Sequence, residues 1–171
     1  MLRLKSFNQA YEFSVEELEA KDEIFTKYKY ALAYIGVDFS QEDVQEALLN
    51  CLDGFEDALR ATIAYWYWLE ENSQTLENPN MALIKALYNR WDSRYWKDEY
   101  LNNPKFKSPC EIFWEQSLKA WGRDIRNEII ADVNSDDNGF EYVLFRNGKT
   151  ITLSVAQRLG WEKLKEYALQ Q

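Results

Sequence analysis

The sequence predicts a mainly α-helical protein, with a body of four helices followed by a C-terminal β-hairpin and a short final helix. Apolar residues recur every three or four positions over most of the chain, which is the spacing of an amphipathic helix. Only six Gly and three Pro interrupt 171 residues, and seven Trp, eleven Tyr and nine Phe provide ample material for a core. We therefore expect one domain over residues 1–171, with residues 1–133 as the helical body and residues 134–171 packed on it.

The first helix is predicted from its capping residues. Residues 1–13 are expected to be irregular. Ser14 is a favourable helix N-cap, and Glu17 stands three residues later, at the spacing of a capping box. The apolar periodicity then continues to Ile35 and ends before Gly36.

The second helix is predicted to be long. It starts behind Ser40, and apolar residues step by three or four to about Ser73, with Gly54 as a weak point. Its last turns contain four consecutive aromatic residues, from Tyr65 to Trp68. Successive helical residues point about 100° apart, so at least one or two of these rings must be exposed or covered by another element.

The remaining elements follow from Pro, Gly and Asn signals. Asn78-Pro79 opens a third helix, predicted to reach Leu101, and Ser108-Pro109 opens a fourth, predicted to end near Asp132. Residues 140–145 and 149–153 are β-rich and flank Asn147-Gly148, a strong hairpin signal. A last helix is predicted over residues 154–168.

The net charge of −9 is concentrated in one segment. Residues 38–71 hold nine acidic side chains and a single basic one, Arg60. Such a chain is a poor general binder of phosphate backbones, which require clustered Lys and Arg. Two interpretations stay open: a solvated helix face that maintains solubility, or a face offered to a basic partner.

Several kinds of reaction chemistry lack their usual residues. The chain has no His, and it contains neither a GxGxxG nor a GxxxxGK[ST] phosphate loop. Cys51 and Cys110 are far apart in sequence and are expected to be free thiols. We therefore expect no catalytic site, no cofactor and no metal.

Two acidic pairs, Glu16 with Glu19 and Asp43 with Glu46, loosely resemble the paired carboxylates with which MazG-type nucleotide pyrophosphatases hold magnesium. Acidic first turns of helices account for both pairs without a metal. The loop from Asn134 to Gly139 matches the first half of a calcium loop, but its twelfth position is Phe145 instead of Glu.

Basic and aromatic residues alternate between positions 90 and 107. Residues 78–91, an apolar helix that ends in Trp91, resemble a helix of DnaD-like replication-initiator domains. The resemblance implies contact with single-stranded DNA or with the replisome, and mixed basic and aromatic residues are what single-strand binding uses. The basic residues of this alternative are Arg90, Arg94, Lys97, Lys105 and Lys107.

The leading hypothesis is a non-enzymatic acidic protein–protein interaction module, such as an inhibitor, an immunity-type protein or an adaptor for a basic or nucleic-acid-processing partner. Aromatic rings supply anchors and complementary charge accelerates association. The predicted contact residues are Asp43, Glu46, Asp53, Asp57, Tyr65, Trp66, Tyr67 and Trp68. The alternative is a replication or mobile-element accessory protein. No apolar stretch suggests a membrane span or a secretory signal, so a cytoplasmic location is expected.

Overall fold

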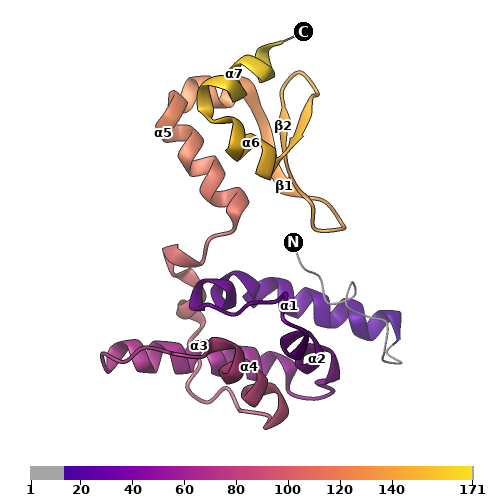
Figure 1. The fold of residues 1–171 in the computed structure, drawn as a ribbon, viewed down its shortest axis with the longest axis vertical. Coiled ribbons are helices and arrows are strands. Elements are labelled where there is room, and N and C mark those ends of the chain that lie inside the picture. Colours follow the sequence, from indigo (N-terminus) through magenta and orange to yellow (C-terminus); the bar gives the residue numbers. More distant parts are fainter. Residues whose placement is uncertain (1–13, 171) are drawn as a thin grey trace. The chain divides into compact units, whose positions relative to one another are not determined.

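The computed structural model describes residues 14–170, which form two compact units, residues 14–107 and residues 108–170 (Figure 1). The predicted fold class is confirmed: the chain is mainly helical, with antiparallel strands and short helices in its C-terminal part. The prediction that residues 1–13 are irregular concerns residues outside those that the structure describes. Within residues 14–170, no helix is both long and apolar enough to cross a membrane.

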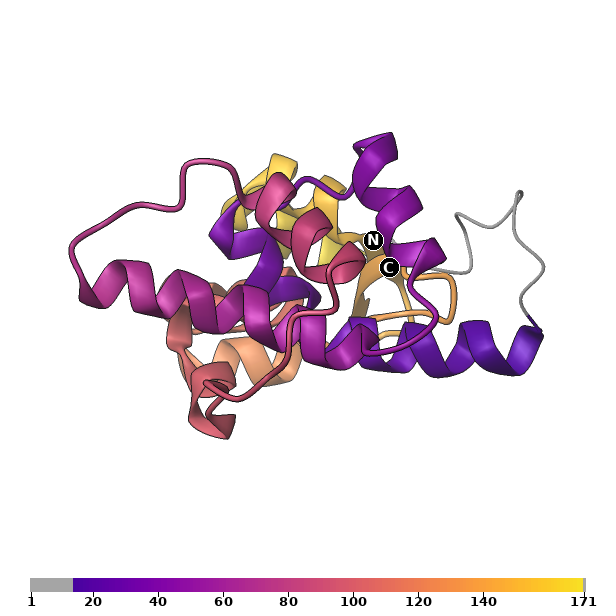
Figure 2. The ribbon, with the colours of Figure 1, turned by 90° about the horizontal axis from the view of Figure 1, so that it is seen from below.

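Four α-helices and two short 3-10 helices make up the N-terminal unit. They are α1 (Val15–Ile35), α2 (Glu42–Asn50), α3 (Phe55–Glu71), α4 (Pro79–Tyr88), η2 (Asp98–Asn102) and η3 (Pro104–Phe106). Helix α3 packs against both α1 and α4, and α2 packs against α4 (Figure 2). Their apolar faces enclose a core whose fully buried side chains include Phe25, Leu32, Leu48, Leu59 and Leu83.

Helix α1 has the ends that were predicted. Ser14 accepts a hydrogen bond from the Glu17 backbone N–H, and the Glu17 carboxylate accepts one from the Ser14 N–H, which completes the capping box. At the other end, Gly36 adopts a φ of 114°, a left-handed conformation that terminates the helix.

The prediction of a single helix over residues 40–73 is wrong, because this part of the chain forms two helices. Helix α2 ends at Asn50, and the buried ammonium of Lys21 donates to the carbonyls of Leu48 and Leu49 at 2.9 and 3.1 Å, which satisfies the helix end. Gly54 then takes a left-handed φ of 69°, and α3 begins at Phe55. The periodicity continues across the break because α2 and α3 contribute to the same core.

The third predicted helix is shorter than expected. Helix α4 begins at Pro79, behind Asn78 as its cap, but it ends at Tyr88 instead of Leu101. Arg90 adopts a left-handed φ of 52°, and the Trp91 N–H donates to the Ala86 carbonyl at 3.0 Å, as in a Schellman motif. Trp91, Tyr95 and Trp96 therefore belong to an irregular segment, and Tyr100 lies in the 3-10 helix η2.

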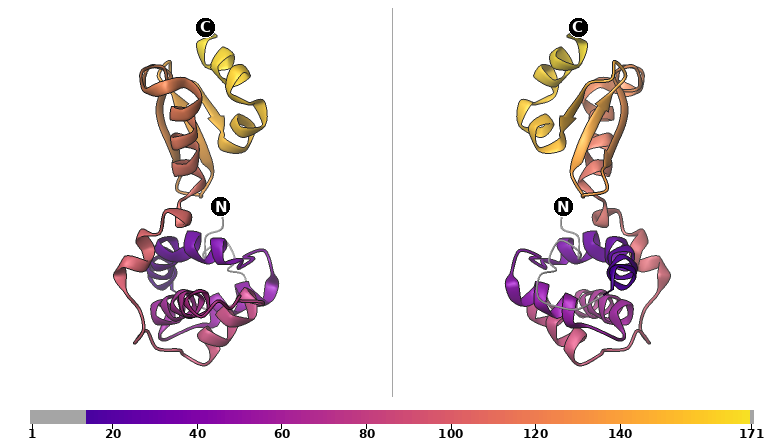
Figure 3. Two further views of the ribbon diagram at one scale, coloured as in Figure 1. Left: turned by 90° about the vertical axis from the view of Figure 1, so that its left-hand side faces the viewer. Right: turned by 90° about the vertical axis from the view of Figure 1, so that its right-hand side faces the viewer.

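The C-terminal unit contains one long helix, a small sheet and two short helices. They are α5 (Pro109–Ile129), β1 (Ile130–Ser135), β2 (Glu141–Phe145), β3 (Thr150–Thr152), α6 (Leu153–Leu159) and α7 (Trp161–Leu169). The strands form an antiparallel sheet in the order β1-β2-β3 (Figure 3). Val143 and Phe145 of β2 are buried in a core shared with all three helices.

Helix α5 groups with this sheet, although the sequence suggested that it belongs with the helices before it. Ser108 caps it as the Ser-Pro signal indicated, Glu111 completes a capping box that was not predicted, and Gly122 (φ 78°) kinks the helix. The expectation of a single domain over residues 1–171 stays a prediction.

The predicted hairpin at Asn147-Gly148 is confirmed, but it is part of a three-stranded sheet. Strand β1, residues 130–135, was expected to be the end of the fourth helix and a loop. The Asp136 carboxylate accepts the backbone N–H groups of Asn138 and Phe140, both at 2.9 Å, and so builds the turn that pairs β1 with β2. The last predicted helix is also divided, at Gly160 (φ 79°), into α6 and α7.

Candidate partner-binding pocket

The irregular segment 89–100 lies along helix α3. Three contacts hold it there and follow the helix in order: Arg90 with Asp53 (3.7 Å), Ser93 with Asp57 (2.7 Å) and Tyr100 with Tyr67 (3.0 Å). Because the residue numbers increase in the same direction along the segment and along the helix, the segment runs parallel to the helix. It ends in η2, where Tyr100 stacks on Tyr67 with ring centroids 4.0 Å apart.

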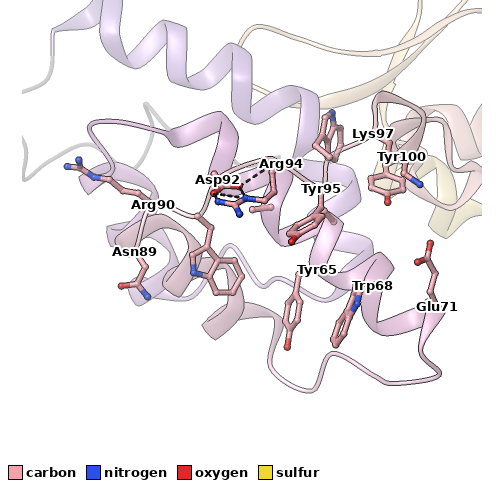
Figure 4. A pocket seen from close by; sticks show the side chains of 14 residues that line it. Tyr65, Trp68, Glu71, Asn89, Arg90, Asp92, Arg94, Tyr95, Lys97 and Tyr100 are labelled. Atoms are coloured by element: carbon pink, nitrogen blue, oxygen red, sulfur yellow. Dashed lines mark hydrogen bonds and ion pairs between the residues drawn. The ribbon is translucent and has the colours of Figure 1, made fainter.

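A pocket of about 970 Å³ lies between α3 and this segment; we call it the aromatic pocket (Figure 4). Six aromatic residues line it: Tyr65, Trp68, Trp91, Tyr95, Trp96 and Tyr100. Its charged residues are Arg90, Arg94, Lys97, Glu71 and Asp92. The volume is in the range of ligand-binding pockets, and the lining combines aromatic rings with charged side chains.

Three of these rings are exposed to solvent. Tyr65 and Trp68 are 37% and 54% exposed, and Tyr95 is 76% exposed. The Tyr65 and Trp68 rings are nearly parallel, with centroids 6.2 Å apart and 13° between their planes. Trp91 meets Tyr65 edge-on at 5.9 Å. The pocket therefore presents aromatic rings to solvent.

The other two members of the aromatic run have structural roles. Trp66 packs against Phe106, with ring centroids 5.7 Å apart, on the core side of α3. The Tyr67 hydroxyl donates to the Tyr100 carbonyl and accepts a hydrogen bond from the Asn103 amide at 3.1 Å. The run thus divides between core and pocket, as the 100° step between successive residues requires.

Two of the three basic side chains of the pocket are paired with carboxylates. Arg94 turns back onto Asp92 and makes three hydrogen bonds of 2.7–3.1 Å with its two oxygens (Figure 4). These bonds hold the pKa of Asp92 below its ordinary value. Arg90 pairs with Asp53, which precedes α3, and Figure 4 shows its side chain directed away from Tyr65 and Trp68. The Lys97 ammonium lies 5.8 Å from the Tyr100 ring centroid.

The four predicted acidic contact residues are all exposed, but they fall into two groups. Asp43 and Glu46 lie on α2 and do not line the aromatic pocket. Asp53 precedes α3 and Asp57 lies in its first turn, and each binds the segment 89–100. Asp53 and Asp57 therefore help to hold the wall of the aromatic pocket.

The basic residues of the nucleic-acid alternative are also divided. Arg90, Arg94 and Lys97 line the aromatic pocket together with the exposed rings, whereas Lys105 and Lys107 do not. The Lys105 ammonium lies over the Tyr34 ring instead, at 5.8 Å. The stretch 90–107 is thus not one continuous basic surface.

Neither cysteine is arranged as a nucleophile. Cys51 and Cys110 are free thiols. Burial raises the pKa of Cys51, and burial together with the nearby Glu141 carboxylate raises the pKa of Cys110 to about 12. Both thiols are therefore protonated at neutral pH. Among residues 14–170, no three Cys, Asp or Glu side chains come together as a metal-binding group.

Comparison with known proteins finds no matching family, no matching curated protein and no matching solved structure. The DnaD-like resemblance of residues 78–91 covers α4 and Trp91, and it stays a prediction.

The site contains residues that sequence reasoning did not assign to it. Glu71 and Tyr95 line the pocket, and Ser93 fixes its wall. The alternating basic and aromatic residues after Arg90 were a visible signal. The sequence did not show that these residues lie beside Tyr65 and Trp68, because that position depends on the end of α4 at Tyr88 and on the return of the chain along α3.

Proposed function

We propose that this chain is a non-enzymatic interaction module that binds a basic protein partner through the aromatic pocket. The observation that carries the proposal is the exposure of Tyr65, Trp68 and Tyr95 in one pocket. Large aromatic residues are the commonest interface anchors, and an exposed cluster of them marks an interaction site.

Charge supports a protein partner of basic character. Residues 14–107 contain eighteen acidic and ten basic side chains, and two of the three basic residues in the pocket are paired with carboxylates. Residues 14–107 therefore carry a net negative charge, which accelerates encounter with a basic surface. An inhibitor, an immunity-type protein or an adaptor for a nucleic-acid-processing enzyme has this kind of partner.

Photo-crosslinking tests the proposal and captures the partner in the same step. Tyr95 is replaced by p-benzoylphenylalanine, and the same replacement at Tyr88 is the matched control, because Tyr88 is 57% exposed but does not line the pocket. Irradiation in native lysate should give a discrete protein adduct from position 95 and none from position 88. Equal adducts from both positions, or no protein adduct, would contradict the proposal.

Single-stranded nucleic acid is the second candidate ligand. Arg90, Arg94 and Lys97 share the pocket with stacking platforms, which is the composition of a single-strand site. The ion pairs of Arg90 and Arg94 and the acidic surroundings weigh against it. A gel-shift assay with single- and double-stranded oligonucleotides decides: a retarded band that Trp68→Ala abolishes favours nucleic acid.

A further inference from the structure

We infer that the occupant of the aromatic pocket is a cationic side chain, Arg or Lys, from a basic segment of the protein partner. The inference rests on the proposed function and specifies the chemical group that the pocket takes. It is carried by the distribution of charge along α3, whose two ends differ.

The Arg-containing end of the pocket is electrically satisfied. Arg90 is bound to Asp53, which lies just before the first residue of α3, and Arg94 is bound to Asp92. Glu71, in contrast, is the last residue of α3. A helix of 17 residues is about 25 Å long, so Glu71 is far from the Arg90–Asp53 pair.

The Glu71 end carries negative charge that is not balanced within the helix. Glu70 and Glu71 both lie in the last turn of α3, and that turn contains no basic residue. The C-terminus of a helix is the negative end of its dipole, where cations are stabilising and acidic residues are not. Among the described residues, neither glutamate forms an ion pair.

Ring faces stand beside this negative end. Trp68 precedes Glu71 by three residues and therefore projects from the same side of α3. Its ring is more than half exposed and is stacked with Tyr65. The negative faces of Trp and Tyr rings attract Arg and Lys, and a nearby carboxylate adds to the attraction. Trp68, Tyr65 and Glu71 together therefore form a site that suits a cationic group.

A polyanion does not fit the same end. The only basic side chain there without an ion pair among the described residues is Lys97, over Tyr100. Removal of Lys97 should therefore strengthen the binding of a cation and weaken the binding of an anion, so a Lys97 variant distinguishes the two kinds of ligand.

Nuclear magnetic resonance of the ¹⁵N-labelled protein tests the inference on the seven Trp indole N–H signals. The probe is the peptide acetyl-Gly-Arg-Gly-Arg-Gly-amide, and its neutral counterpart carries citrulline in place of both arginines. We expect the arginine peptide to shift the Trp68 indole signal with a Kd on the order of 1 mM, and the citrulline peptide to bind at least about fivefold more weakly.

Three variants test where the arginine peptide binds and whether the site prefers a cation. Glu71→Gln should weaken arginine-peptide binding about fivefold, whereas Glu70→Gln, with the same charge change outside the pocket, should change it less than about twofold. Lys97→Gln should strengthen binding. Unchanged indole signals of the remaining Trp residues verify the fold of each variant.

Equal effects of the two glutamate variants, equal binding of both peptides, or no binding would overturn the inference. So would binding of a ten-residue oligothymidylate that Lys97→Gln weakens, which would assign the pocket to nucleic acid. A protein adduct from position 95 together with a failed arginine peptide would overturn the cationic occupant alone; without that adduct, the proposed function fails as well.

Discussion

The hydroxyl group of Ser93 donates a hydrogen bond of 2.7 Å to the carboxylate of Asp57. The bond joins the first turn of α3 to the segment 89–100 and so helps to hold the wall of the aromatic pocket. Asp57, which the charge pattern suggested as a partner contact, has a structural role in this arrangement.

A double-mutant cycle measures this bond. Ser93→Ala and Asp57→Ala should each lower the free energy of unfolding by about 0.5–1.5 kcal/mol, because each removes one hydrogen bond. The double variant should lose less than the sum of the two single losses. Urea denaturation followed by Trp fluorescence provides the values. Strict additivity would mean that the two side chains do not interact in solution.

Two helix ends make opposite predictions for glycine. Ser73 has a left-handed φ of 55° at the end of α3, where Gly is the favoured residue. Ser73→Gly should therefore raise the free energy of unfolding by about 0.5–1 kcal/mol, as measured by urea denaturation.

Gly36→Ala should have the opposite effect. Gly36 has a φ of 114°, and a Cβ atom there would stand 3.1 Å from the Pro79 Cγ. We expect a loss of about 1–3 kcal/mol, because the backbone is strained and the contact is too close. A neutral result for both glycine changes would contradict the described conformations of these helix ends.

Alkaline pH should destabilise the N-terminal unit through Tyr28. The Tyr28 hydroxyl is buried between Glu56 and Arg60, and burial followed by the Glu56 hydrogen bond raises its pKa to about 12. Since this pKa exceeds the unfolded value of about 10, the stabilisation is complete below pH 10 and is lost as the pH rises towards 12.

Urea midpoints at pH 9, 10 and 11 measure the effect. The wild-type midpoint should fall with pH more steeply than that of Tyr28→Phe, which has no ionisable hydroxyl at this position. Equal slopes for the two proteins would show that Tyr28 ionises as readily in the folded state as in the unfolded chain.

The exposed acids of α2 should influence the rate of association. Asp43 and Glu46 do not line the pocket, so Asp43→Lys with Glu46→Lys should lower the association rate constant and its salt dependence while leaving the dissociation rate nearly unchanged. Surface plasmon resonance with the crosslinked partner, at low and high salt, measures both rates. An unaltered association rate would identify this acidic face as solvated surface only.

Local signals in the sequence predicted much of the fold. The helix caps at Ser14 and Ser108 and the turn at Asn147-Gly148 are formed by neighbouring residues, and the structure contains all three. Periodicity alone failed between Asn50 and Phe55, because two helices facing one core continue the same pattern. It also failed after Tyr88, where aromatic residues spaced like a helix pack on α3 as an irregular segment.

The candidate site was predictable in parts. The argument from 100° steps required some of the four consecutive aromatic residues to be exposed, and Tyr65 and Trp68 are the exposed ones. The role of Asp53 and Asp57 as supports was not predictable, since their partners are more than thirty residues away in sequence.

The affinity for the partner identified by crosslinking tests the central claim most directly. Isothermal titration should show that Trp68→Ala and Tyr95→Ala each raise the Kd at least about tenfold, because anchor residues dominate binding energy, whereas Tyr88→Ala changes it less than about twofold. Kd values within about twofold of wild type for both pocket variants would contradict the assignment of the aromatic pocket as the binding site.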